Sequence, residues 1–146
     1  MCIRDSPIKT AIVRDLGMPT SYDSEALLLA IVFLLKDLRN AIAHNAIVLD
    51  VRFKSGGASS GIGKLLNSET GVKSINFSDI TDYIVLIAYL LGLFGFSKTE
   101  RKALVSGYET ILSRYKKELP PGIYGKFVRT ETAGKLKLVL RFVAQS

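Results

Sequence analysis

Two nearly uninterrupted apolar stretches, residues 26–35 and 84–96, limit what this 146-residue chain can fold into. Each is shorter than the ~18 to 20 residues that a membrane-spanning helix needs, so we expect both to be helices buried in a protein core. The N-terminus lacks the basic segment followed by an apolar segment that marks a secretory signal. We therefore predict a soluble, cytoplasmic protein with no membrane contact.

Composition favours one compact domain without metal or cofactor. A chain of 146 residues, 48% of them apolar, is neither disordered nor fibrous and can bury roughly two thirds of its unfolded surface. Its one cysteine, Cys2, excludes a disulfide inside the chain. Its one histidine, His44, has no Cys or His partner except Cys2. We expect no metal site built from these residue types and no cofactor.

The first six residues, Met-Cys-Ile-Arg-Asp-Ser, resemble a translated sequencing adaptor, a scar familiar from assembled metagenomic reading frames. We therefore expect the natural chain to start upstream of Pro7, and Cys2 not to be native. The charge balance is unaffected, because Arg4 and Asp5 cancel.

Capping and breaking signals divide most of the chain into helices, so we predict a mainly α fold. A helix of about twenty residues begins at Glu25 and becomes amphipathic toward its end. Ser78 can cap a helix over residues 79–94, and Ser97-Lys-Thr-Glu100 forms a capping box for a helix that runs to about Glu118. A short helix is also predicted over residues 7–16.

Other segments lack a helical signal. Residues 54–63 hold four glycines and three serines and predict a mobile loop, while residues 47–53 are ambiguous between a strand and an extended connection. In the C-terminal tail, Leu136, Leu138, Leu140 and Phe142 alternate with other residues as in a strand, which can pair with residues 126–131 in a short β-hairpin. We therefore divide the chain into a helical domain, residues 7–119, and a basic tail, residues 120–146.

The residues that carry chemistry concentrate in the segment 38–45, Leu-Arg-Asn-Ala-Ile-Ala-His-Asn. Arg39 and His44, separated by four residues, have the Arg-x4-His spacing. With Asp50-Val-Arg-Phe53 and the later segments 80–91 and 97–100, this sequence resembles the Abi-like (abortive infection) family of the HEPN superfamily. The resemblance covers about residues 28–117.

The resemblance implies a HEPN-like helical bundle whose N-terminal helices are missing here. It also implies a metal-independent endoribonuclease of bacterial phage defence, with catalytic Arg39, Asn40 and His44. It further implies a homodimer in which paired motifs line a cleft between the protomers, and an antitoxin partner. Asp50 and Arg52 can support this site, or they can form a local ion pair that fixes the chain after the helix.

Helix geometry leaves two ways to assemble the motif. Around an ideal helix Asn40 and His44 are about 40° apart, whereas Arg39 and His44 are about 140° apart. Either the helix ends near His44 and lets the imidazole swing, or a dimer brings Arg39 of one chain toward His44 of the other. A histidine can accept or donate a proton near neutral pH, and an arginine can bind phosphate oxygens through two hydrogen bonds.

The charge is uneven along the chain. Residues 98–146 carry eleven basic and four acidic residues, which accounts for the whole net charge of +7. This basic third can form a weak RNA track or a solvated helix face. The residues of the track are Lys98, Arg101, Lys102, Arg114, Lys116 and Lys117. The alternative function is therefore a non-catalytic module of the HEPN type that binds RNA or a partner. Because DNA lacks the 2′-hydroxyl, no DNA-specific binding is expected.

Overall fold

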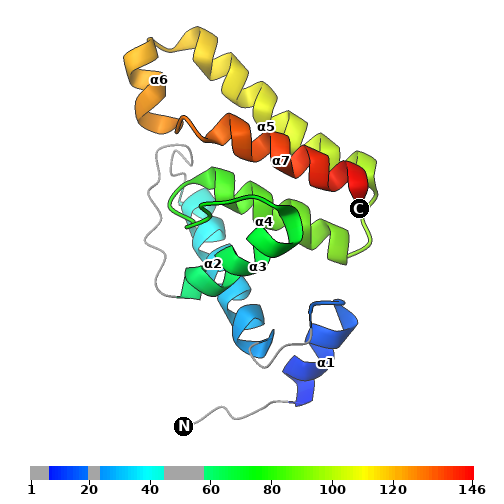
Figure 1. The fold of residues 1–146 in the computed structure, drawn as a ribbon. Coiled ribbons are helices and arrows are strands. Elements are labelled where there is room, and N and C mark those ends of the chain that lie inside the picture. The colour runs from blue at the N-terminus through cyan, green and yellow to red at the C-terminus, as the bar shows by residue number, and fades with distance from the viewer. Residues whose placement is uncertain (1–6, 20–23, 45–57) are drawn as a thin grey trace.

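The computed structural model describes residues 7–19, 24–44 and 58–146, and over these ranges it is helical, with no strand (Figure 1). The mainly α fold is confirmed. The described residues form seven helices, α1 Pro7–Asp15, α2 Ser24–Ala43, α3 Ala58–Thr70, α4 Ile80–Leu93, α5 Lys98–Glu118, α6 Pro121–Phe127 and α7 Thr132–Gln145. None of these helices is long and apolar enough to cross a membrane.

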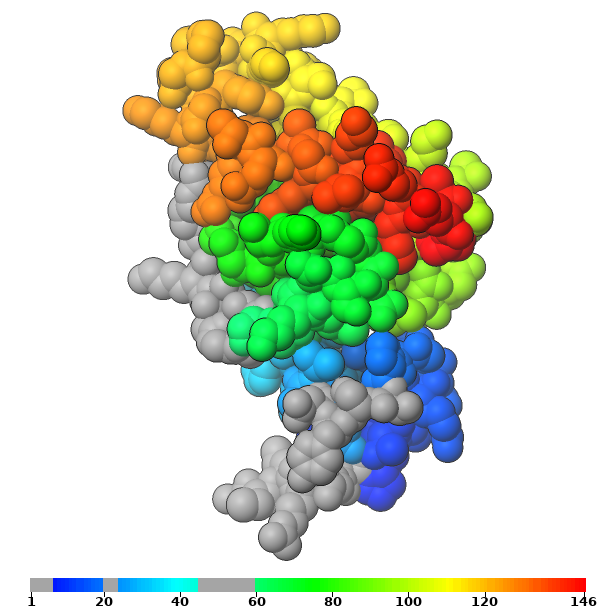
Figure 2. All heavy atoms as spheres, viewed as in Figure 1, coloured from blue at the N-terminus to red at the C-terminus, as the bar shows by residue number. Residues whose placement is uncertain are grey.

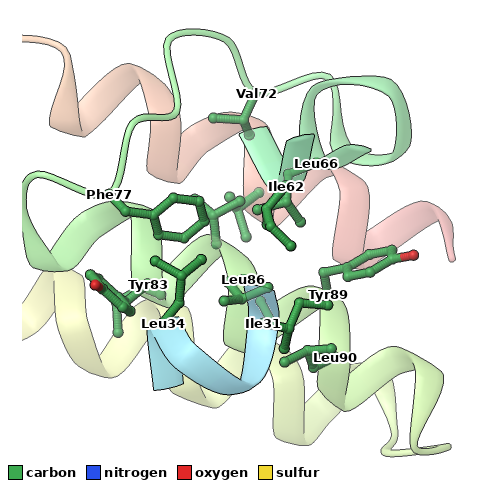
Figure 3. Close-up of a cluster of buried hydrophobic side chains, with 14 of the residues drawn as sticks. Ile31, Leu34, Ile62, Leu66, Val72, Phe77, Tyr83, Leu86, Tyr89 and Leu90 are labelled. Carbon is green, nitrogen blue, oxygen red and sulfur yellow. The ribbon is translucent and has the colours of Figure 1, made fainter. Parts of the chain in front are cut away.

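Helix α4 is the centre of the bundle. It packs against α3 on one side and against the antiparallel pair α5 and α7 on the other (Figure 1). Consequently its residues are buried almost all round, as the apolar stretch predicts. In the core, Leu34 of α2 and Leu86 of α4 lie close to Phe77, whose ring meets that of Tyr83 edge to face at 5.3 Å (Figure 3).

The helix boundaries follow local signals. Ser97 and Glu100 form the predicted capping box of α5, and Gly95, with φ +80°, ends the preceding helix as expected. The N-cap of α4 is Asp79, not the predicted Ser78, and its carboxylate accepts the backbone N–H of Thr81 at 3.0 Å. The predicted helices over residues 7–16 and from Glu25 onward are confirmed as α1 and α2.

The predicted C-terminal β-hairpin is wrong, because residues 121–127 and 132–145 form α6 and α7. The alternating pattern also contains Leu136, Val139 and Val143 at helical spacing, and these three residues are buried against the rest of the bundle. Because α4 and α5 present an apolar surface, the segment forms the helix that buries these three residues together rather than a strand. The segment 120–146 therefore packs on the residues before it.

The predicted mobile loop is also wrong from Ala58 onward, where α3 begins; residues 45–57 lie outside the described ranges. Ile62 and Leu66 of α3 are fully buried. Gly63 permits this packing, since a Cβ there would lie 2.7 Å from the carbonyl oxygen of Ile75. Gly63 thus allows close packing of a helix.

Candidate functional site

The Arg39–His44 motif lies at the C-terminal end of α2. Arg39 and His44 are exposed and Asn40 is half-buried. The helix ends at Ala43, and the backbone N–H of His44 still donates to the carbonyl of Asn40 at 3.0 Å. His44 thus directly follows the last helical residue, and both arrangements that the spacing allows are compatible with this position. Arg39 faces solvent in a different direction, about 140° around the axis.

An exposed apolar surface continues along α2 from the motif. Leu29, Val32 and Phe33 are exposed, Phe33 to 58%, and they lie opposite the buried Ile31 and Leu34. We call these three exposed residues the α2 apolar face. Around the helix, Leu29, Phe33 and Asn40 fall within about 40° of one another, so the apolar face and the motif share one side of α2. The predicted supporting residues, Asp50 and Arg52, lie outside the described ranges.

The predicted RNA track divides into two exposed groups. Lys98 and Lys102 are exposed in the first turns of α5, whereas Arg114, Lys116 and Lys117 are exposed in its last turns. The rise of the helix separates Lys102 from Arg114 by about 18 Å. Arg114 lies 3.8 Å from Glu118 in a solvent-exposed ion pair, which weakens its attraction for other anions.

Arg101, the sixth member of the track, is only 4% exposed and is therefore not placed to contact RNA. Its Nε donates to the carbonyl of Ala88 at 3.1 Å and its Nη1 to the Ser146 hydroxyl at 2.9 Å. The guanidinium also lies 5.1 Å from the centre of the Phe142 ring. Burial lowers the pKa of Arg101. The side chain joins α4, α5 and α7.

A buried ion pair that the sequence did not reveal connects α4 with α7. Lys135 Nζ donates to Asp82 Oδ1 at 2.6 Å and to the carbonyl of Ser74 at 2.9 Å. The second carboxylate oxygen of Asp82 accepts the backbone N–H groups of Asn76 and Phe77 at 2.9 and 3.0 Å. These bonds hold the α3–α4 connection, in which Ser74 and Phe77 have φ of 57° and 55°. The partners are 53 residues apart, so no local pattern predicts them.

The buried tyrosines Tyr83 and Tyr108 keep their hydroxyl protons at neutral pH. Burial, together with the charges of Asp37 and Asp82, raises the pKa of Tyr83 to about 12. Burial also raises the pKa of Tyr108 to about 12, and its hydroxyl lies 3.2 Å from that of Thr81. In the described ranges, no group of three His, Cys, Asp or Glu side chains could hold a metal ion.

Comparison of the chain with protein-family models, with curated proteins and with solved structures finds no match.

Proposed function

We propose that this protein is a metal-independent endoribonuclease of bacterial phage defence, with Arg39, Asn40 and His44 as its catalytic residues. The observation that carries the proposal is the motif itself: a histidine and an arginine, both exposed, at the end of one helix. The resemblance of residues 38–45 to the Abi-like family of the HEPN superfamily supports the choice of RNA as substrate.

The chemistry follows from these side chains. One imidazole removes the proton of a ribose 2′-hydroxyl, whose oxygen attacks the adjacent phosphorus while the bond to the 5′-oxygen breaks. A second imidazole protonates the leaving 5′-oxygen. Arg39 stabilises the charge that builds on the phosphate oxygens, and Asn40 orients His44 or binds a phosphate oxygen. The products are a 2′,3′-cyclic phosphate and a 5′-hydroxyl.

Because each chain has one histidine, the proposal includes a homodimer. The α2 apolar face (Leu29, Val32, Phe33) supports this, since it is exposed on the same side as Asn40. Pairing through this face would bring the two motifs together and supply both the base and the acid. Arg39 of one protomer would then act with His44 of the other.

Cleavage of 5′-labelled RNA in excess EDTA tests the function. We expect the wild type and Lys64→Ala, a matched loss of charge at an exposed position of α3, to cleave, and His44→Ala and Arg39→Ala to lose at least about 100-fold in rate. Circular dichroism checks that each variant is folded. Cleavage that persists in His44→Ala would refute the catalytic assignment.

Mixing the wild type with an equal amount of His44→Ala tests the shared site. If the base and the acid are the His44 residues of the two protomers, random assortment leaves active only the quarter of the dimers that contain two wild-type chains. Retention of about half of the activity, with sedimentation showing mixed dimers, would refute the shared site.

A non-catalytic module that binds RNA or a partner is the second candidate. The exposed cations of α5 favour it, because they can hold a polyanion without cutting it. In that case RNA is retained on a filter and stays intact with every variant. A partner bound by such a module would cover these exposed cations of α5. The antitoxin of an active enzyme would cover the same cations.

A further inference from the structure

A groove of about 430 Å³ lies where the first turns of α5 meet the last turns of α7. The end of α7 lies beside the start of α5 (Figures 1 and 2). Lys98 Nζ donates to the carbonyl of Ala144 at 3.3 Å, which holds the two helix ends side by side. The lining residues are Lys98, Thr99, Lys102, Leu140, Arg141, Val143 and Ala144.

The groove is positively charged. Three of its lining side chains, Lys98, Lys102 and Arg141, are cationic, and none of its lining residues is acidic. Across the described ranges, no carboxylate lies within ion-pair distance of these three. The nearby Glu100 accepts hydrogen bonds from the Ser97 N–H at 2.9 Å and the Ser97 hydroxyl at 2.7 Å. The uncompensated charge therefore attracts an anion.

Two exposed aromatic rings lie in the connection that leads into α5. Phe94 and Phe96 are 57% and 47% exposed in the connection between α4 and α5. Phe96 precedes Lys98 by two residues, and Gly95 turns the chain between the rings with φ +80°. Exposed aromatic rings beside cations are the combination with which proteins hold single-stranded nucleic acid, since bases stack on rings while phosphates meet the cations.

We propose that this α5–α7 groove, with Phe94 and Phe96, docks single-stranded RNA at a site separate from the Arg39–His44 motif. Charge complementarity selects a polyanion, and the two exposed rings favour one with bases over an acidic peptide. The choice of RNA over single-stranded DNA rests on the proposed function. Lys137, exposed one turn before Arg141, extends the positive surface along α7.

Fluorescence anisotropy with a labelled 12-nucleotide RNA tests the docking site, and 2′-O-methyl groups prevent cleavage. We expect Lys102→Glu/Arg141→Glu to weaken binding at least about tenfold at low salt. The matched control, Lys64→Glu/Lys73→Glu, has the same charge change at two exposed positions, in α3 and in the connection after it, and should weaken binding less than about threefold. Phe94→Ala/Phe96→Ala should weaken binding about tenfold and leave its salt dependence unchanged.

Neutral substitutions add a second measurement. For Lys102→Gln/Arg141→Gln, the slope of log affinity against log salt should fall by about 1.4, the value for two lost phosphate contacts to a single strand. The proposal is overturned if the groove and control variants lose affinity equally. It is also overturned if the groove variant loses binding to phosphatidylserine vesicles while RNA binding is unchanged, because the groove would then face a membrane.

The two proposals fail in different ways. If RNA is never cleaved but binding depends on Lys102 and Arg141, the ribonuclease fails and the docking groove stands. If RNA is cleaved and the groove variants bind and cleave like the wild type, the docking groove fails and the ribonuclease stands.

Discussion

Removing Lys135 tests the buried ion pair most directly. Its side chain is 6% exposed and that of Asp82 is fully buried, with 2.6 Å between Nζ and Oδ1. In Lys135→Met the apolar stem is kept and the carboxylate of Asp82 is left buried without a cation. Breaking a buried pair in this way costs about 3–5 kcal/mol. For a chain of this size that lowers the melting temperature by about 10 °C.

A double-mutant cycle isolates the charge. Asp82→Asn keeps an oxygen that can accept the backbone N–H groups of the α3–α4 connection but removes the negative charge. We therefore expect Lys135→Met/Asp82→Asn to be more stable than Lys135→Met alone, with a coupling of about 2 kcal/mol or more.

Urea unfolding followed by circular dichroism measures these free energies. The control is Lys137→Met, an exposed lysine one turn away on α7, which should change stability by less than about 0.5 kcal/mol. A loss below about 1 kcal/mol for Lys135→Met, or additive single and double variants, would refute the reasoning.

Three further predictions concern single positions. Gly63→Ala should destabilise by about 1–3 kcal/mol in urea unfolding, since its Cβ meets a backbone oxygen at 2.7 Å, whereas Gly107→Ala in open space should be neutral or stabilising. Arg101→Met should lower the melting temperature, because the guanidinium of Arg101 donates hydrogen bonds to a carbonyl and a hydroxyl group of the protein. It should not cause the salt-dependent loss of RNA affinity that is expected when a phosphate contact is removed. Ser97→Ala should cost about 1 kcal/mol at neutral pH. Hydrogen bonds from Ser97 also lower the pKa of Glu100, so the stability that this carboxylate contributes is complete above pH 4.5 and is lost as the pH falls through the lowered pKa, as melting at several pH values would show.

Local signals predicted most of the helices and the position of the motif. The capping box at Ser97 and the helical periodicity after Glu25 depend on residues within a few positions, so the sequence alone specifies them. The same holds for the placement of Arg39 and His44 at the end of a helix. Whether these residues cleave RNA stays a prediction.

The sequence alone determined about where α1, α2, α4 and α5 begin and end and which residues could do chemistry. Tertiary structure decided the conformation of α7, whose apolar pattern fits a strand or a helix until α4 and α5 bury Leu136, Val139 and Val143. It also decided which basic side chains are available to bind an anion. Arg101 and Lys135 are buried against partners far along the chain, while Arg141 is exposed beside Lys102. The physical reason is that burial and charge pairing depend on contacts between distant segments, which no local pattern records.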